Sequence, residues 1–553
     1  MVLLMSKKVG AILLDTRSIQ RYVFGSNKMK TNTGASYLVD AIFSEAMVDV
    51  LKASELALPQ KAWEATECLQ MVEDDSIEAE IAYIGGGNML VLVNKGEATA
   101  SVCRELVRKW SLRVLLNAPG LKTGVAIGEL EIDNENNGEF KISLDDLYKQ
   151  LKENQNNILP QVDLPYTGFT IECDYSGKAA NVFSEAYGRL VSAEVLAKIN
   201  AYTYAAAKNK IDYSSSLGEE YEFCSELESI GFAEGESYIS AIHIDGNNMG
   251  VKFSNCRNMN ERKELSLKVK QMVKDAFEHL VNTIINEYKS YDSVLDMRKL
   301  QQGKKLLLPL RPIIIGGDDI TFICPGRMGL EYAKRFIECI NRKDLLDEKF
   351  EKLFKKIQSN EGKMFGRRLS CCAGVAIVPA KYPFFRAYEL AEQLCSEAKA
   401  KSRKDDGSYL DFAILHGEKY GDIGLLRKEQ YLTNVGRLHY GPYRVLGDKK
   451  DKDSMEALFA LTKDLMADSM PHNKVKELRR VLHESKHSMS IFLENCPEIR
   501  QLLQKETGVE AVNADSLWEK DNVKRWDKEY VTRYIDAIEI MDFVYPQEET
   551  EVK

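Results

Sequence analysis

Residues 312–323 read Pro312-Ile313-Ile314-Ile315-Gly316-Gly317-Asp318-Asp319-Ile320-Thr321-Phe322-Ile323. Apolar, β-branched runs on both sides of paired glycines are typical of two strands joined by a tight turn. Glycine tolerates the backbone angles of such a turn, so the carboxylates beside it can stand at the surface of a sheet. The stretch therefore predicts a β-hairpin that presents Asp318 and Asp319.

A second apolar run ends in an aspartate upstream of the hairpin: Tyr238-Ile239-Ser240-Ala241-Ile242-His243-Ile244-Asp245. If this run pairs with the hairpin, Asp245 lies beside Asp318, and three carboxylates surround one point. Glycine and aspartate are also ordinary turn residues, so the hairpin alone is a weak functional signal. Its combination with Asp245 favours a catalytic site.

The same arrangement occurs twice in the chain. The run Val9–Asp15 matches the run that ends in Asp245, and Ile81–Leu92 matches the hairpin, each about 230 residues earlier. A third pair consists of Gly124-Val125-Ala126-Ile127 and Gly374-Val375-Ala376-Ile377. Three landmarks in the same order predict a duplicated domain.

Each unit combines strand and helix signals. Residues 262–289 and 385–403 carry apolar residues at helical spacing between the strand landmarks. The order predicts an α+β fold: two tandem palm domains, which are ferredoxin-like sheets of the nucleotidyl-cyclase type with helices on one face, plus α-helical domains. The predicted units are a first palm at 1–135, an inserted and linking helical region at 136–235, a second palm at 236–415 and a helical C-terminal domain at 416–553.

Composition narrows the functional class. The 553 residues exceed what one hydrophobic core usually supports. No run approaches the roughly 20 apolar residues of a membrane span, so we expect a cytoplasmic protein with no membrane partner. The eleven cysteines form no CxxC pair, which argues against a zinc ribbon or redox motif. A net charge of −9 argues against a chain that wraps nucleic acid over its whole surface.

The carboxylates fit two-metal phosphoryl transfer. Two divalent ions, Mg²⁺ or Mn²⁺, need Asp or Glu oxygens as ligands, and Asp245, Asp318 and Asp319 supply them. The turn after Asp245, together with the glycines of the hairpin, is a candidate phosphate cradle whose amides point at anionic oxygens. Its residues are Gly246, Asn247, Asn248, Gly316 and Gly317.

Lysines at the end of the helix 385–403 complete the candidate site. Lys399 or Lys401 could reach a terminal phosphate, although a solvated helix end is an equally good interpretation. The resulting prediction is a nucleotidyltransferase that joins the α-phosphate of ATP to a hydroxyl acceptor.

The first unit departs from this pattern at the hairpin. It keeps Asp15 but has Gly87-Asn88 where the second unit has Asp318-Asp319, and neither replacement is an anionic ligand. We therefore expect the first palm to be non-catalytic. Gly34-Ala35-Ser36 and Ser176-Gly177-Lys178 are candidates for an acceptor-nucleotide pocket, or plain loops, with Ser36 as the candidate binding residue.

These residues resemble the large polymerase/cyclase subunit of type III CRISPR effector complexes, particularly the Cmr type. The matching motifs are Asp245-Gly246-Asn247-Asn248-Met249-Gly250, Ile315-Gly316-Gly317-Asp318-Asp319, Gly374-Val375-Ala376-Ile377, Asp15–Phe24 with Gly34–Leu38, and Met470-Pro471-His472-Asn473-Lys474-Val475. The resemblance implies cyclic oligoadenylate synthesis from ATP when the complex binds target RNA. It also implies the other effector subunits and a guide RNA as partners, and Mg²⁺ or Mn²⁺ on Asp245, Asp318 and Asp319.

The chain departs from that family in two ways. The family usually begins with an HD nuclease domain and carries a cysteine zinc site, and we expect neither here, since the sequence has no His-Asp pair and no CxxC. The resemblance therefore implies a branch without the HD domain. Some such relatives are thought to transfer AMP to S-adenosylmethionine, so this acceptor is an alternative.

Two further alternatives remain open: a standalone second-messenger synthase related to diguanylate cyclases, and a scaffold whose palms only bind nucleotide. The tandem palms favour the effector subunit over the first, and the three aspartates disfavour the second. RNA contact is expected through limited basic surfaces, with a predicted helix at 474–486 as one candidate, although a solvated charged face is an equally good interpretation of that helix.

Overall fold

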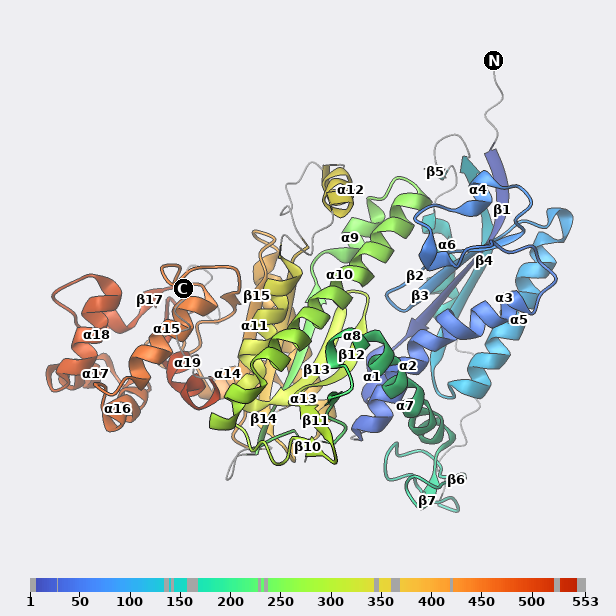
Figure 1. The fold of residues 1–553 in the computed structure, drawn as a ribbon. Helices are drawn as coiled ribbons and strands as arrows, with labels where there is room; N and C mark the ends of the chain where they lie inside the picture. The colour runs from blue at the N-terminus through green and yellow to red at the C-terminus, as the bar shows by residue number, and fades with distance from the viewer. Residues whose placement is uncertain are drawn as a thin grey trace.

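The protein is elongated, with three parts in sequence order along its length (Figure 1). The computed structural model describes residues 6–26, 28–133, 139–140, 144–156, 168–226, 230–232, 237–342, 348–359, 369–417, 421–521 and 528–544. The first sheet and its helices lie at one end, the second sheet lies in the centre, and the C-terminal helices form the other end.

The first sheet has the strand order β2-β3-β1-β4-β5, and all its neighbours are antiparallel. Its strands are β1 (Ser6–Arg17), β2 (Ala79–Gly85), β3 (Asn88–Val93), β4 (Lys122–Asp133) and β5 (Glu139–Phe140). β5 and α6 (Leu144–Asn156), which packs on β4, lie beyond the predicted boundary at 135. They complete the layers of the first unit.

Helices cover both faces of this sheet. Leu14 of β1 shares a core with Trp110 of α5 (Thr99–Asn117), and Leu13 shares another with Leu151 of α6. Successive strand residues point to opposite faces, so α5 and α6 lie on opposite sides. The remaining helices of this unit are α1 (Ile19–Phe24), α2 (Met29–Ala41), a π-helix (Ile42–Met47), α3 (Val48–Lys52) and α4 (Gln70–Glu73).

The linking region packs a long helix against the first unit. It contains β6 (Val182–Ser184), β7 (Arg189–Val191), α7 (Ala193–Asp212), α8 (Ser214–Leu217) and β8 (Tyr221–Phe223). α7 lies along α2 at Gly34, where an added Cβ would stand 1.8 Å from the carbonyl oxygen of Lys198. The small residues Gly34-Ala35-Ser36 are therefore part of a helix–helix contact and not a loop.

The second sheet repeats the first. Its order is β12-β13-β9-β14-β15-β16, and its first four strands correspond in sequence order to β2-β3-β1-β4. The strands are β9 (Tyr238–Gly246), β12 (Arg311–Gly316), β13 (Asp319–Pro325), β14 (Cys371–Pro379), β15 (Tyr409–Ile414) and β16 (Tyr443–Arg444). The predicted α+β class with two palm sheets is confirmed.

The helices of the second unit cover two faces rather than the predicted one. They are α9 (Met249–Ser254), α10 (Met259–Asn286), α11 (Gly329–Ile340), α12 (Glu348–Ser359) and α13 (Phe384–Ser402). Ser240 contacts the start of α11, whereas His243, three residues along β9, packs edge-on against Tyr388 of α13. Residues three apart on a strand face opposite sides, so α13, the crossover between the parallel strands β14 and β15, lies opposite α11.

The third sequence landmark is misaligned by two residues. Gly124 is the register partner of Asp15, whereas Gly374 is the partner of His243, two residues before Asp245. Gly374 allows α13 to approach β14, because a Cβ there would lie 1.9 Å from the carbonyl oxygen of Ala391. The two glycines therefore serve different contacts.

The helix α10 connects the two units. Its first turns touch the first unit, where Asn260 accepts a hydrogen bond from the Leu69 amide at 2.8 Å and Ser266 donates to the Ile84 carbonyl at 3.0 Å. Buried Lys263 pairs there with buried Glu80 at 3.4 Å. Further along, Phe277 packs against Phe322 of β13. One continuous helix thus belongs to both cores.

The C-terminal part is mainly helical, as predicted. It contains α14 (Ile423–Gln430), α15 (Met455–Met466), α16 (His472–Leu482), α17 (Lys486–Glu494), α18 (Pro497–Thr507), β17 (Glu519–Lys520), β18 (Tyr530–Val531) and α19 (Tyr534–Glu539). Its strand β16 joins the second sheet beyond the predicted boundary at 416. The predicted helix at 474–486 is two helices, α16 and α17.

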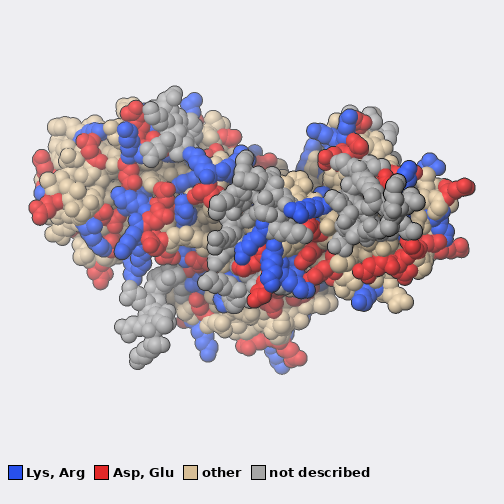
Figure 2. Space-filling view, turned by 90° about the horizontal axis from the view of Figure 1, so that it is seen from above, with Lys and Arg blue, Asp and Glu red and all other residues tan. Residues whose placement is uncertain are grey.

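Charge is mixed on the face that Figure 2 draws: Lys and Arg gather in small groups among Asp and Glu side chains. Within the described residues, no helix is both long enough and apolar enough to cross a bilayer.

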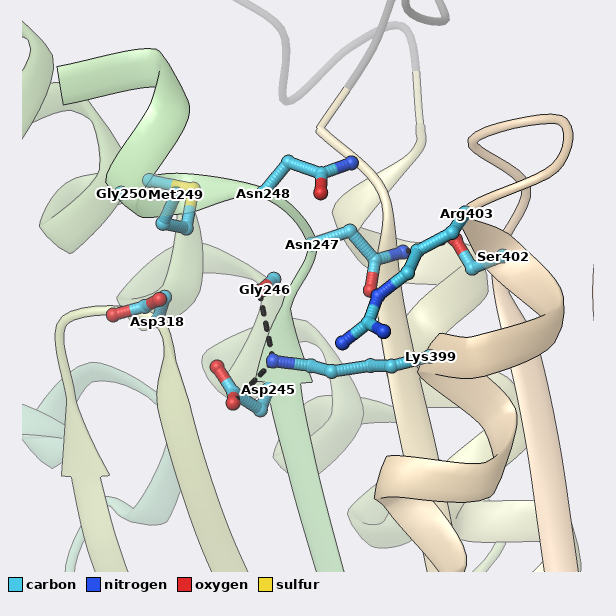
Figure 3. A pocket seen from close by; sticks show the side chains of 10 residues that line it. All are labelled: Asp245, Gly246, Asn247, Asn248, Met249, Gly250, Asp318, Lys399, Ser402 and Arg403. Carbon is cyan, nitrogen blue, oxygen red and sulfur yellow. Dashed lines mark hydrogen bonds and ion pairs between the residues drawn. The ribbon is translucent and has the colours of Figure 1, made fainter. Parts of the chain in front are cut away.

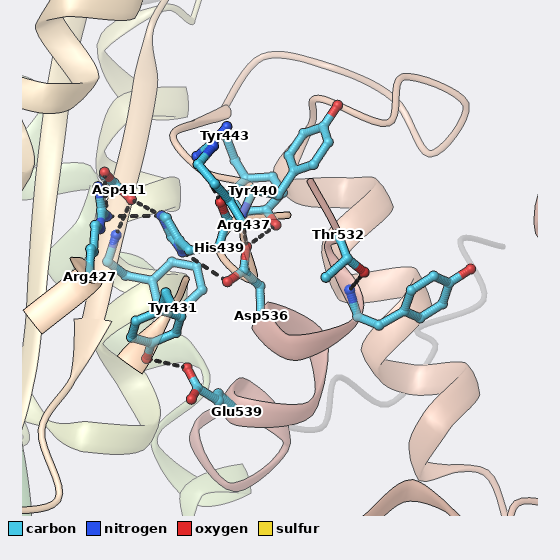
Figure 4. A network of polar contacts seen from close by, with 12 residues as sticks. Asp411, Arg427, Tyr431, Arg437, His439, Tyr440, Tyr443, Thr532, Asp536 and Glu539 are labelled. Carbon is cyan, nitrogen blue, oxygen red and sulfur yellow. Dashed lines mark hydrogen bonds and ion pairs between the residues drawn. The ribbon is translucent and has the colours of Figure 1, made fainter. Parts of the chain in front are cut away.

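A buried polar network joins the second sheet to the C-terminal helices (Figure 4). His439 contacts Asp411 of β15 at 2.9 Å and Asp536 of α19 at 2.8 Å. Arg427 pairs with Asp411 at 2.8 Å, and Asp536 also accepts hydrogen bonds from the Tyr440 amide and the Tyr443 hydroxyl. The two buried carboxylates are thus matched by buried cations and donors.

Replacing Asp536 with Ala should destabilise the protein by about 3–5 kcal/mol, because it leaves His439 and two donors buried without their acceptor. Asp453→Ala is the matched control: its carboxylate accepts from the Tyr440 hydroxyl at 2.5 Å but is partly exposed, so the loss should stay near 1 kcal/mol. Urea unfolding measures both. Equal losses would contradict the role assigned to the network.

Candidate functional site

The hairpin between β12 and β13 forms as predicted, with a two-residue turn, Gly317-Asp318. Gly317 has φ of 59°, a left-handed value that suits glycine at the first central position of a hairpin turn. The turn leaves Asp319, and not Asp318, as the register partner of Asp245. Asp318, in the turn itself, still lies close to Asp245 as predicted, since the charge of Asp245 raises its pKa.

An open polar pocket of about 330 Å³ lies beside this hairpin (Figure 3). Six of its lining residues are among the predicted site residues: Asp245, Gly246, Asn247, Asn248, Asp318 and Lys399. Four are not: Met249, Gly250, Ser402 and Arg403. The predicted residues Asp319, Gly316, Gly317 and Ser36 lie outside the lining, and Ser36 is half-buried on α2 of the other unit.

The carboxylates at the pocket are crowded. Burial and the neighbouring charge of Asp245 raise the pKa of Asp318 to about 7, and Asp319 adds to the same effect. A carboxyl group with this pKa is half-protonated near neutral pH, because ionising it places like charges side by side. The site therefore lacks positive charge.

Lys399 supplies part of that charge. Its ammonium, near the end of α13, pairs with Asp245 and donates to the Gly246 carbonyl at 3.1 Å (Figure 3). Burial alone would lower the pKa of Lys399, but Asp245 outweighs it and the net pKa is raised. Lys401, the other predicted candidate, turns away and donates to the Pro442 carbonyl at 2.8 Å.

Arg403 is a pocket residue that the sequence analysis missed. It follows Lys399 by four residues at the end of α13, and Figure 3 shows its guanidinium above Lys399. Residues four apart share a helix face, so the i, i+4 spacing of the two cations was the available signal.

Asp319 lies on the α13 side of the sheet. Its Oδ1 lies 3.4 Å from the Nδ1 of His243, an ion pair when the ring is protonated, and accepts no hydrogen bond of ordinary geometry within the described residues. Burial would lower the pKa of His243, but Asp319 outweighs burial and raises it. A buried carboxylate oxygen without a donor is suited to a cation.

The predicted cradle is only partly available. The amide of Gly246 donates to the Asp318 carbonyl at 3.1 Å, and the amide of Asn247 donates to the Ser370 carbonyl at 2.9 Å. Neither amide is free for a phosphate. Gly246 has a packing role instead, because a Cβ there would lie 2.9 Å from Asp318 Cβ.

Asn247 and Asn248 fix the turn after β9. Asn247 Nδ2 donates to the hydroxyls of Ser402, at 2.9 Å, and Ser370, at 3.1 Å. Asn248 has a left-handed φ of 54°, and its amide group donates to Asp406 at 3.2 Å. These contacts tie the pocket floor to the end of α13.

The donor set fits a divalent cation, although no ready-made cage is present: among the described residues, no group of three or more His, Cys, Asp or Glu side chains is arranged around one point as a metal site. Two observations support the fit: the Oδ1 of Asp319, which has only the 3.4 Å contact with His243 among the described residues, and the raised pKa of Asp318. A cation at the end of β9 would give the Asp319 oxygen a partner and would stabilise the ionised form of Asp318.

The first unit holds a neutral counterpart of this site. Asp15 pairs in register with Asn88, just as Asp245 pairs with Asp319 in the second unit. Three residues after Asp15, Ser18 has a left-handed φ of 52°, close to the value of Asn248. Gln155, near the end of α6, donates to Asp15 at 2.6 Å in the place where Lys399 meets Asp245. Gly124 makes room for it, since a Cβ there would lie 2.5 Å from Gln155.

Residues 238–407 match the family model described as Cas10/Cmr2, second palm domain. No curated protein matches the chain.

Three solved structures are similar at low sequence identity. The Csm1–Csm4 cassette in complex with cA3 aligns with a TM-score of 0.49 and 10% identity over 98% of this chain and 70% of that chain. The Csm1–Csm4 cassette in complex with one ATP aligns at 0.48 and 11%, with the same coverage. Csm1 in T. onnurineus aligns at 0.47 and 11%, again over 98% and 70%. By the match of its sequence to the family model, the segment 238–407 is a palm domain similar to the second palm domain of Cas10/Cmr2.

Proposed function

We propose that the second palm transfers the adenylyl group of ATP to a hydroxyl acceptor, making a nucleotide second messenger of the cyclic oligoadenylate type. The acceptor oxygen bonds to the α-phosphorus, the bond from that phosphorus to the β-phosphate oxygen breaks, and pyrophosphate leaves. The observation that carries the proposal is one open pocket that holds the carboxylates Asp245 and Asp318 together with the cations Lys399 and Arg403. Asp319, the register partner of Asp245, lies just outside its lining.

Each side chain has a role in this reaction. Asp245, Asp318 and Asp319 would hold divalent ions, Mg²⁺ or Mn²⁺, which would supply positive charge at the transferring phosphoryl group. Lys399 and Arg403 face the same pocket and bind the triphosphate, whose negative charge grows on the leaving pyrophosphate. The turn Gly246-Asn247-Asn248 fixes the distance between the carboxylates and these cations.

The first palm has no equivalent chemistry. Its Asp15 faces the neutral Gln155 and Asn88, so it attracts neither a metal ion nor a triphosphate in the same way. Replacing Gly87 with Asp would also be strained, because Gly87 has φ of 75° and a Cβ there would lie 2.5 Å from Ile19. One catalytic centre per chain follows.

The family match supports a place for the chain as the signalling subunit of a type III CRISPR effector complex, with other effector subunits, a guide RNA and a target RNA as partners. The deciding experiment compares ATP consumption by the chain, by the assembled complex and by the complex with target RNA. Strong stimulation by target RNA supports this role, and full activity of the chain alone supports a standalone synthase. Mass spectrometry of products, with and without S-adenosylmethionine, identifies the acceptor.

Replacing Asp318 or Asp319 with Asn should lower adenylyl transfer by about 10²–10³-fold, because each change removes charge that stabilises the transferring phosphoryl group. The matched control is Asp15→Asn, the equivalent change in the first palm, which should keep the rate within a few fold. Circular dichroism checks that all three variants fold. Wild-type turnover in the Asp318 and Asp319 variants would refute the assignment.

Stability should depend on the ionisation of Asp318. Its folded pKa, about 7, lies above the ordinary value of 3.8, so the folded state binds more protons between these pH values and loses stability as pH rises through them. Without divalent ions at pH 8, Asp318→Asn should therefore melt at a higher temperature than the unmodified chain, with the difference vanishing near pH 4.

Added Mn²⁺ should raise the melting temperature of the unmodified chain at pH 8 and have less effect at pH 6, where protons compete with the metal. Thermal scans with Mn²⁺ and with a chelator measure both effects. An Asp318→Asn variant that melts below the unmodified chain at pH 8 would show that Asp318 is not electrostatically strained.

A further inference from the structure

A second pocket lies at the seam between the two halves of the chain, away from the aspartates. It measures about 270 Å³ and is lined by α2, α7, β8 and the start of β12. Arg311, at the first position of β12, and Thr33, on α2, both line it. Since β12 carries Gly316 at its other end, the pocket and the Gly317-Asp318 turn lie at opposite ends of this strand.

Arg311 is a buried charge without a counterion. Arg311 is only 3% exposed, and its Nη1 donates a hydrogen bond to the Ser225 carbonyl. Its Nη2 has no hydrogen-bond acceptor in the described part of the chain, and no described carboxylate lies within ion-pair distance of it. Burial lowers the pKa of Arg311, which reflects the same uncompensated charge. Buried guanidinium groups are ordinarily paired.

Nearby acidic groups are already engaged. The charge of Glu226 favours the charged form of Arg311, but Glu226 forms its ion pair with Lys30. Glu222 pairs with Lys210 at 3.1 Å. The positive charge of Arg311 therefore remains for something else in the pocket.

Thr33 provides an independent second observation. It is buried on α2, which packs against β12, and its Oγ1 has no hydrogen-bond partner within the described residues. A buried hydroxyl without a partner carries a desolvation cost that a ligand atom would remove. Apolar lining residues stand beside these two polar groups: Leu217, Phe223 and Pro312.

We propose that this pocket binds a small organic anion, a phosphate monoester or a carboxylate, with its anionic group on Arg311 and Thr33 and its apolar part against Phe223. Because Thr33 belongs to the first palm unit and Arg311 to the second, the bound anion fastens the two units together. The site is separate from the nucleotide pocket, and its occupancy is measurable without any turnover.

The test uses phenyl phosphate, benzoate and inorganic phosphate as probes, with neutral benzamide as the uncharged analogue of benzoate. Isothermal titration calorimetry and thermal shift are run on the full chain. Phenyl phosphate or benzoate should bind with Kd below about 10 mM and raise the melting temperature, while benzamide should not. Which probe binds better separates a phosphate ligand from a carboxylate ligand.

Two variants locate the binding. Arg311→Gln should weaken it at least about tenfold, the loss expected for a charge-assisted hydrogen bond. Thr33→Val preserves shape and should weaken binding while leaving the ligand-free chain as stable as before or more so. It keeps the test decisive if Arg311→Gln does not fold.

Arg403→Gln is the matched control, the same substitution at an arginine of the nucleotide pocket, and should leave the probe affinities unchanged. The proposal is overturned if no anion binds, if binding survives both Arg311→Gln and Thr33→Val, or if Arg403→Gln abolishes it instead. None of these outcomes bears on adenylyl transfer, so the two proposals stand or fall separately.

Discussion

The repulsion among three carboxylates at the end of β9 is the constraint on which the architecture of the second palm depends. Asp245 and Asp319 are held opposite each other by strand register, and the turn adds Asp318 beside them. Ionising all three is costly, and the raised pKa of Asp318 expresses that cost. The chain needs a cation there, and α13 brings Lys399 to it.

Bringing Lys399 to this point explains other features of the fold. α13 must cross the sheet on the face of Asp245 and His243, close enough for a lysine to reach the strand end. Gly374 permits that approach, because any side chain there would collide with the α13 backbone. The second face of helices, absent from the simplest ferredoxin-like layout, is thus tied to the chemistry of the site.

The two palms show how one framework supports two electrostatic states. Strand order, register at the aspartate and the left-handed residue three positions later are the same in both. The groups around that aspartate differ: Asn88 and Gln155 in one palm, Asp319 and Lys399 in the other. A neutral amide, Gln155, donates to Asp15 in the first palm, whereas a cation, Lys399, meets Asp245 in the second.

Much of this was predictable from the sequence, and the misses have physical causes. The apolar runs and paired glycines locate the sheets because strand burial depends on local pattern. The register partner of Asp245 could not be assigned from the sequence, because four consecutive turn-forming residues do not reveal which two form the turn. Gly124 was aligned with Gly374 because both are glycines, although one admits Gln155 and the other α13. Ser36 was placed in a pocket because small residues suit loops and close helix contacts equally.

Arg403 was missed although its i, i+4 spacing from Lys399 is a signal in the sequence. Gln155 and Arg311 were missed for a different, common reason. Each acts through a partner distant in the sequence, and a single charged or amide residue at the end of a helix or strand carries no local signal of that partner. The three aspartates were found because their neighbours in the chain are informative.

The helix α10 connects the two palms rigidly, because it packs into both. Its first turns are anchored to the first palm by Asn260, Lys263 and Ser266, and its later turns are part of the core beneath β13. Helices resist bending far more than loops do, so a tilt of the first palm cannot be absorbed locally and must reach the strand that carries Asp319. Any protein or nucleic acid that binds and tilts the first palm therefore displaces the Gly317-Asp318 hairpin without touching it.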